Sequence, residues 1–162
     1  MLKETTELES LRQKIEDAEY EAGDRSNYLD YGKPNPAQAK QARELIEKLK
    51  EESKAARAEL KQLLGTLRAQ QPQAIDEWVN YHAGILQKII DEKTEAVITP
   101  RKNVAKETLQ NWEKVRAGEL DYVNINWHFL KDYKASVRTI TGGKAKAASK
   151  TTESKSWFQF WK

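Results

Sequence analysis

The segment from Pro36 to Ala69 constrains the fold most, because apolar residues recur in it at helical spacing over 34 residues. Oppositely charged residues on its other side lie four apart, a spacing that supports an exposed helix face. These pairs are Lys40–Glu44, Arg43–Glu47, Glu44–Lys48 and Lys48–Glu52. At 1.5 Å per residue such a helix is about 50 Å long. A rod of this length exceeds a compact domain of 162 residues, so the sequence predicts an elongated molecule.

Three further segments carry apolar residues at helical spacing. The first has a narrow stripe that ends near Gly23, where we expect the helix to stop. The segment from Pro72 to Lys93 has the widest apolar face, which predicts the most buried helix. A fourth pattern runs from Asn103, an expected N-cap, to Ile140. We expect it to continue through Gly118, because no second turn-forming residue accompanies that glycine.

Residues typical of turns separate these segments. Residues 24–36 are rich in Asp, Asn, Gly and Pro and predict a long first loop, with Asn35 as an N-cap and Pro36 as the first helical residue. Residues 94–102 include Pro100 and predict another loop. Short connections between long helices make neighbouring helices antiparallel. The predicted fold of residues 1–140 is therefore all-α: an elongated antiparallel three- to four-helix bundle, or coiled-coil hairpins.

The charge of the chain is unevenly distributed although its net value is only +3. Residues 1–33 carry a net charge of −4, whereas residues 141–162 carry +4. The chain contains no cysteine, which excludes disulfides and thiolate chemistry. The acidic N-terminus has no apolar stretch typical of a secretory signal, and no apolar run approaches the roughly 20 residues that span a bilayer. We therefore expect a cytoplasmic protein.

The last six residues, 157–162, contain four of the fourteen aromatic residues. They follow residues 141–156, which are rich in Lys, Ser, Thr and Ala and predict a flexible tether. Large aromatic side chains dominate many protein interfaces, so the pattern predicts a C-terminal docking segment. The candidate partner-binding residues are Trp157, Phe158, Phe160, Trp161, Lys155 and Lys162.

Three other interpretations of this C-terminal segment stay open. The aromatic side chains could fold back and cap the end of the bundle. Alternatively, the lysines and aromatics together could bind a membrane surface, where Trp and Phe lie at the level of the headgroups. The same mixture could bind nucleic acid, with lysines on phosphates and aromatic rings stacked on bases. Two observations argue against the last two interpretations: the tail contains no arginine, and the body is not basic.

The other aromatic and ionisable residues favour structural roles. Trp112 and Trp127 have core spacing, whereas three tyrosines near the first loop, Tyr20, Tyr28 and Tyr31, are expected to cap one end of the bundle. The two histidines, His82 and His128, are interpreted as packing or surface residues, because neither follows a glutamate three positions earlier as in di-metal helix bundles. Adjacent carboxylates, such as Glu16-Asp17, are interpreted as solvated helix faces.

No catalytic, cofactor-binding or metal-binding residue is predicted, and no small-molecule substrate. The sequence instead predicts a non-enzymatic structural or adaptor protein of a larger assembly. We expect it to self-associate as a homo-oligomer and to bind protein partners through its C-terminal segment. The alternatives are an accessory protein of membranes or nucleic acids, which would use the same segment, and a virion or scaffold component.

Overall fold

The computed structural model describes residues 1–92, 98–125 and 129–141, which form five α-helices and no strand. This confirms the predicted all-α class. The helices are α1 (Lys3–Tyr31), α2 (Pro36–Gln70), α3 (Pro72–Asp91), α4 (Ile98–Ala117) and α5 (Lys131–Arg138). None of the described helices combines the length and the apolar composition needed to cross a bilayer.

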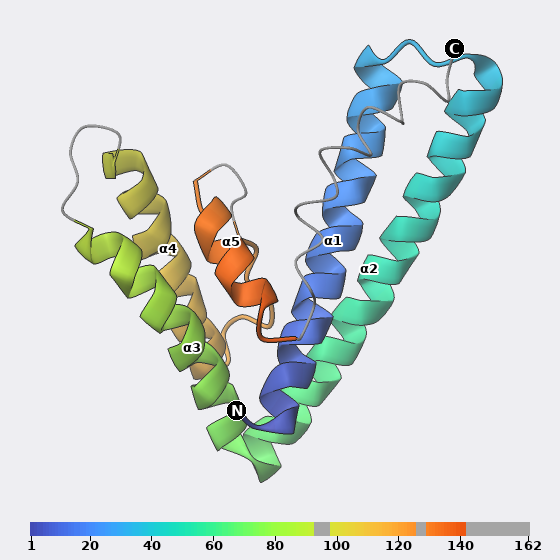
Figure 1. Ribbon diagram of the computed structural model, residues 1–162. Coiled ribbons are helices and arrows are strands. Elements are labelled where there is room, and N and C mark those ends of the chain that lie inside the picture. The colour runs from blue at the N-terminus through green and yellow to red at the C-terminus, as the bar shows by residue number, and fades with distance from the viewer. Residues whose placement is uncertain (93–97, 126–128, 142–162) are drawn as a thin grey trace.

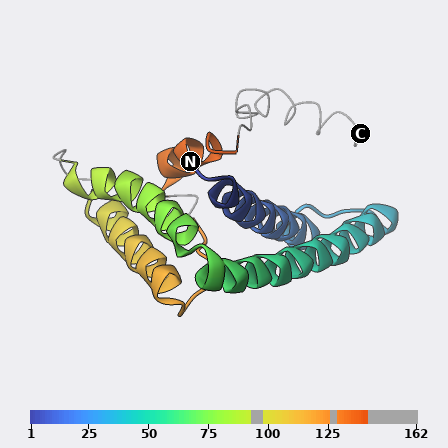
Figure 2. The same ribbon diagram turned by 90° about the horizontal axis from the view of Figure 1, so that it is seen from below.

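The helices form two antiparallel hairpins that diverge like the arms of a V (Figure 1). One arm consists of α1 and α2, and the other of α3 and α4. The arms meet at the α2–α3 turn, near the N-terminus, and the short α5 lies between them (Figure 1). The view from below shows the same divergence (Figure 2). The described body is therefore elongated, as the length of α2 predicts.

Prolines and capping residues fix both ends of α2 where the sequence predicts them. The side chain of Asn35 accepts a hydrogen bond from the Gln38 amide at 2.9 Å, and the Gln38 side chain accepts one from the Asn35 amide at 3.0 Å. This capping box satisfies two amides that the helix itself leaves free. At the other end Pro72 starts α3 directly after Gln71, because its missing N–H is not needed in a first turn.

The predicted stop at Gly23 is wrong, because α1 continues to Tyr31 and the first loop shrinks to residues 32–35. A glycine inside a helix costs only about 1 kcal/mol relative to alanine. Ala18 of α1 and Ile46 of α2 are buried along the α1–α2 hairpin, and packing against α2 supports the continued helix. The glycine that ends α1 is Gly32, where a Cβ would lie 2.6 Å from the carbonyl oxygen of Tyr28.

The predicted loop over residues 94–102 is wrong from Ile98 onward, where α4 has begun, and residues 93–97 lie outside the described residues. Pro100 is the third residue of α4, and a first turn tolerates proline because its amides have no partner within the helix. Asn103 therefore lies within α4 and is not its N-cap.

The predicted continuous helix from Asn103 to Ile140 is also wrong, because it breaks at Gly118. This residue has a φ of +83°, the left-handed conformation that glycine adopts without a Cβ penalty. Its amide donates to the carbonyl of Val115 at 3.1 Å, and the next amide donates to Lys114 at 2.8 Å. These bonds complete the end of α4, so neither a proline nor a second turn-forming residue is needed to stop the helix here.

Replacing Gly118 with alanine should destabilise the fold by about 1–2 kcal/mol, because an L-residue is strained in the left-handed region. Gly84→Ala is the matched control. Gly84 is exposed within α3, a Cβ there would contact nothing within 4 Å, and alanine should stabilise the helix by up to about 1 kcal/mol. Urea denaturation of both variants would measure the difference. Equal effects of the two substitutions would contradict this account of the break.

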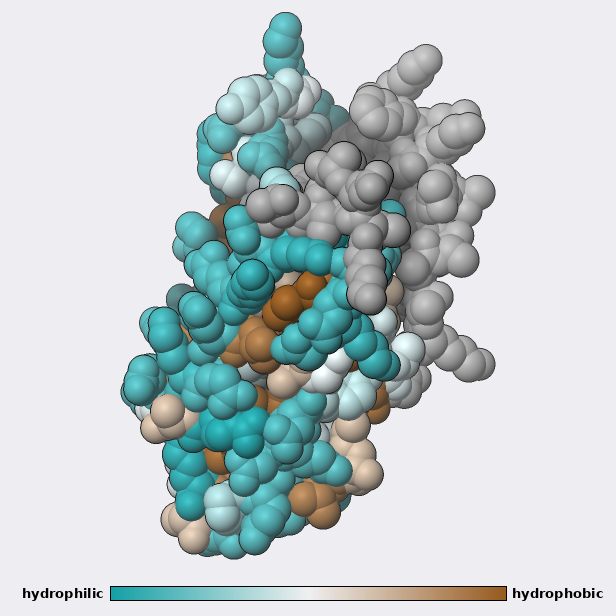
Figure 3. Space-filling view, turned by 90° about the vertical axis from the view of Figure 1, so that its left-hand side faces the viewer, coloured by the Kyte–Doolittle hydropathy of each residue, from teal (hydrophilic) through white to brown (hydrophobic). Residues whose placement is uncertain are grey.

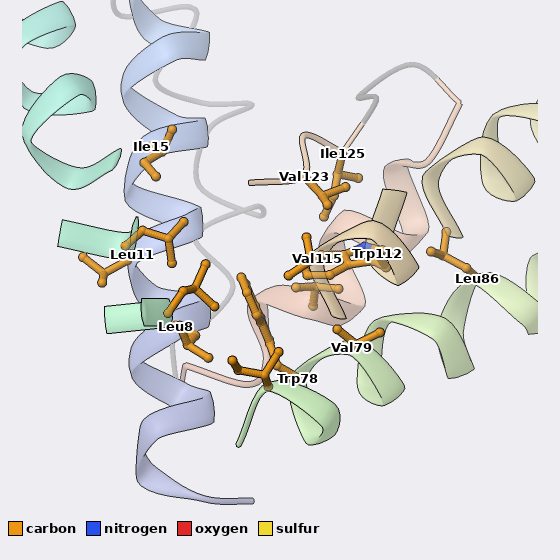
Figure 4. Packing of buried hydrophobic residues seen from close by; sticks show 14 of the residues in the cluster. Leu8, Leu11, Ile15, Trp78, Val79, Leu86, Trp112, Val115, Val123 and Ile125 are labelled. Carbon is orange, nitrogen blue, oxygen red and sulfur yellow. The ribbon is translucent and has the colours of Figure 1, made fainter. Parts of the chain in front are cut away.

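The core forms where the two arms and α5 converge (Figure 4). Trp78 of α3 and Trp112 of α4 are fully buried there, which confirms the predicted core position of Trp112. Trp127 lies outside the described residues. The α3 face is buried as predicted, through Ala74, Ile75, Trp78, Val79, His82, Leu86 and Ile89. On the side of the molecule that Figure 3 shows, the coloured surface is mainly hydrophilic with small apolar areas between polar side chains.

Candidate functional site

The most unusual feature of the described residues is a buried carboxylate, Glu9 of α1, whose exposed fraction is 0%. Its Oε2 accepts hydrogen bonds from Trp78 Nε1 at 2.8 Å and from His82 Nε2 at 2.7 Å. Its Oε1 accepts from Arg12 Nη2 at 2.8 Å and from Gln13 Nε2 at 3.1 Å. Both oxygens are therefore fully engaged by donors from α1 and α3.

Four charged side chains alternate in sign through this region, and we call them the charge cluster: Glu9, Arg12, Glu16 and Lys134. Arg12 is buried and pairs with Glu9 at 2.8 Å and with Glu16 at 3.3 Å. The second oxygen of Glu16 lies 3.5 Å from Lys134 Nζ of α5. Two negative and two positive charges give the charge cluster a net charge of zero. Buried charges need such a balance to offset their loss of hydration.

Three rings continue the network away from Glu9, and we call them the aromatic chain: His82, Tyr133 and Trp112. Trp112 Nε1 can only donate, and it donates to the Tyr133 hydroxyl oxygen at 2.9 Å. The Tyr133 hydroxyl then donates its own proton to His82 Nδ1. Hence His82 carries its proton on Nε2, where it donates to Glu9. A neutral His82 satisfies every donor and acceptor in the aromatic chain.

The net effect of burial and neighbouring charges favours the same protonation states as the hydrogen bonds do. Burial alone would raise the pKa of Glu9, but the charge of Arg12 and hydrogen bonds from His82 and Arg12 outweigh it and lower the pKa to about 2. Burial lowers the pKa of His82 despite the opposing contact with Glu9. Burial raises the pKa of Tyr133 well above its usual value. Near neutral pH, Glu9 is therefore ionised, whereas His82 and Tyr133 are neutral.

Ring packing holds the histidine in this orientation. The His82 ring stacks on Trp112 with centroids 3.8 Å apart and planes 13° apart. Trp78 meets Trp112 edge to face at 4.8 Å. Side chains packed this tightly have few alternative rotamers. The charge cluster and the aromatic chain together fix α1, α3, α4 and α5 relative to one another.

Helix periodicity explains how α1 presents two different buried faces. The apolar stripe that contains Leu8, Leu11 and Ile15 forms one buried face. Beside it, four polar residues are buried at successive spacings of four, three and four: Thr5, Glu9, Arg12 and Glu16. The Thr5 hydroxyl donates to the carbonyl of Ala74 at 3.2 Å, so this second face meets α3. Residues on one helix face recur at these spacings.

A cavity of about 510 Å³ adjoins the charge cluster between α1, α4 and α5. Glu16 and Lys134 contribute to both the cavity and the cluster. Its other lining side chains are Glu19, Tyr20, Val104, Glu107, Thr108, Asn111, Asn124 and Ile125. Among the described residues, no group of three or more Asp, Glu or His side chains has an arrangement suited to a metal ion.

The predicted partner-binding residues lie within 142–162, outside the described residues: Trp157, Phe158, Phe160, Trp161, Lys155 and Lys162. His128 is likewise outside them. His82 packs in the core as predicted, whereas Glu16 is buried and its assignment to a solvated face is wrong. Tyr31 is 82% exposed and does not cap the bundle, and the Tyr20 ring faces Lys134 at 5.4 Å rather than the first loop.

Sequence reasoning missed Glu9, Arg12, Tyr133 and Lys134. The sequence contains one signal of this buried polar face. The apolar stripe of α1 is narrow for a helix that has neighbours on two sides. A second face had to be buried, and the residues beside the stripe at helical spacing are polar. Without knowledge of the helix opposite, these residues are indistinguishable from a solvated face.

Comparison with protein-family models, with curated proteins and with solved structures finds no match to this chain. The residues and their geometry are therefore the basis for assigning a function.

Proposed function

We propose that this chain is a non-enzymatic structural or adaptor protein: a rigid two-armed bracket that joins a larger assembly through its C-terminal aromatic segment, residues 157–162. The observation that supports this most is the buried junction of the charge cluster and the aromatic chain. Its buried polar side chains bind one another, from four different helices. Such an arrangement serves to hold helices in place.

Buried ion pairs contribute little net stability compared with apolar residues, because desolvation offsets their attraction. Their contribution here is orientation. An apolar contact between α1 and α3 would tolerate sliding and rotation, whereas the hydrogen bonds of Glu9 to Trp78 and His82 are satisfied in one arrangement only. The junction thereby holds the two arms at one angle, and α1 extends about 33 Å from Glu9 to its last residue, Tyr31.

The C-terminal segment supplies the attachment in this proposal. Tryptophan and phenylalanine are among the residue types that bury the most surface at protein interfaces. The segment has two of each, Trp157, Phe158, Phe160 and Trp161, and the residues before it are polar. The tail begins after Thr141, whose hydroxyl donates to Gln13 of α1 at 3.2 Å. Its starting point therefore lies between the arms. The partner that fits is a protein with an apolar groove that accepts large rings.

Replacing the four aromatics of residues 157–162 with alanine should abolish partner capture while helicity and the melting temperature stay unchanged. Gln159→Ala, within the same segment, is the matched control and should retain capture. Quantitative mass spectrometry of proteins that co-purify with wild type and both variants measures the effect. Capture of the same partners by the four-alanine variant would refute the proposed attachment. Light scattering on the same samples tests the expected homo-oligomer.

A further inference from the structure

The half of α1 that is farther from the junction has an exposed acidic face, which we define by Asp17, Glu21 and Asp24. Spacings of four and three place these residues on one side of the helix. Residues 17–31 contain five acidic residues and a single cation, Arg25, which lies 3.5 Å from Glu21. Among the described helices, α2 packs against this half of α1. The contact uses the apolar side of α1, which includes Ala18 and lies opposite the acidic face.

The chain beyond Thr141 has the complementary charge. Residues 142–162 carry five lysines and one glutamate. They leave the described body beside α1, where the Gln13 side chain bonds both the Thr141 hydroxyl and the carbonyl of Val137. One cation just before this point, Arg138, already pairs with Asp17 of the acidic face. The basic segment thus begins at the near end of the acidic face.

We propose that the lysine-rich segment 144–155 binds the acidic face of α1 in the same molecule. The lengths agree. The helix rises about 17 Å from Gln13 to Asp24, and the nine residues from Thr141 to Lys150 span roughly 15–18 Å as a coil. Lys144 and Lys146 then reach the level of Asp17 and Glu21. Lys150 reaches Asp24.

Exposed ion pairs are individually weak. The contact between the lysine-rich segment and the acidic face nevertheless forms in most molecules, because both belong to one chain. A short tether gives the lysines an effective concentration in the millimolar range next to their carboxylates. The contact directs residues 157–162 toward the tip of the α1–α2 arm, where Tyr31 is 82% exposed. This inference goes beyond the proposed function and does not depend on it, because the lysine-rich segment and the aromatic segment are tested separately.

Zero-length carbodiimide cross-linking of the full chain, followed by peptide mass spectrometry, tests the proposal. The reagent joins a lysine directly to a carboxylate that touches it. An equal mixture of ¹⁴N- and ¹⁵N-labelled chains separates cross-links within one molecule from those between two. The test variant is Asp17→Asn/Glu21→Gln/Asp24→Asn. The matched control removes three exposed carboxylates from α2, as Glu44→Gln/Glu47→Gln/Glu51→Gln. Circular dichroism verifies that both variants are folded.

We expect isotopically unmixed cross-links from Lys144, Lys146 or Lys150 to the acidic face. Their yield should fall roughly tenfold in roughly 1 M NaCl, where the Debye length is about 3 Å. It should fall likewise in the test variant and stay unchanged in the control. Cross-links that favour other carboxylates, or that persist in the test variant, would overturn the proposal. Isotopically mixed cross-links would also overturn it, because the acidic face would then bind the tail of a second molecule.

Discussion

Replacing Arg12 with methionine is expected to destabilise the fold by about 3–5 kcal/mol, the cost of breaking a buried ion pair from one side. Among the described side chains, the substitution leaves Glu9 with no cation and Glu16 with only Lys134, and Glu9 has an exposed fraction of 0%. Methionine fills much of the vacated volume, so the loss measures charge rather than a void. Urea denaturation at neutral pH gives the change in the free energy of unfolding.

The matched control is Arg57→Met, which removes an arginine that pairs with Glu19 at 2.6 Å on the surface. That pair is partly exposed, and such pairs contribute at most about 1 kcal/mol. Similar losses in Arg12→Met and Arg57→Met would show that Arg12 does not neutralise buried carboxylates. The difference between the two variants is therefore more informative than either value alone.

Stability is expected to fall in two steps as the pH is lowered, one from His82 and one from Glu9. Its folded pKa of about 2 lies below the usual 4.5. The unfolded chain therefore takes up a proton on this group before the folded chain does, and stability is lost as the pH falls from 4.5 toward 2. The difference corresponds to about 3 kcal/mol. His82 contributes an earlier step below pH 6.5, since its folded pKa is also lowered.

Urea denaturation of wild type and Glu9→Gln between pH 7 and pH 2 separates Glu9 from the other carboxylates. Glutamine removes the charge, so the variant should be less stable at pH 7, and the two curves should converge as wild-type Glu9 becomes protonated. Glu7→Gln, on the exposed side of the same helix, should parallel wild type throughout. A constant difference between wild type and Glu9→Gln at all pH values would contradict a lowered pKa for Glu9.

The longest and most regular helices could be predicted from sequence because local signals determine them. Asn35, Pro36 and Pro72 mark the ends of α2 and the start of α3, and the structure places them there. The two glycines Gly23 and Gly118 were misassigned for one reason. Both are compatible with either a helix or a stop, and packing against the neighbouring helix decides which conformation forms.

The buried junction could not be predicted, because its residues are far apart in sequence. Glu9 and His82 are separated by 73 positions, and His82 and Tyr133 by 51. A buried glutamate is stable only beside its donors, and local sequence does not reveal which helix supplies them. The break at Gly118 also had to be known, since it allows α5 to turn back and place Tyr133 beside His82. The predicted docking residues lie outside the described part of the chain.

The distance between the two arms tests the central claim most directly. Cysteines introduced at Asn27 of α1 and Lys88 of α3 can carry spin labels without background, because the chain has no other cysteine. Pulsed electron resonance should give one narrow distance distribution in this doubly labelled protein, and a broader one when Arg12→Met is added. A broad or multiple distribution without Arg12→Met would show that the arms move freely and that the buried junction does not set their angle.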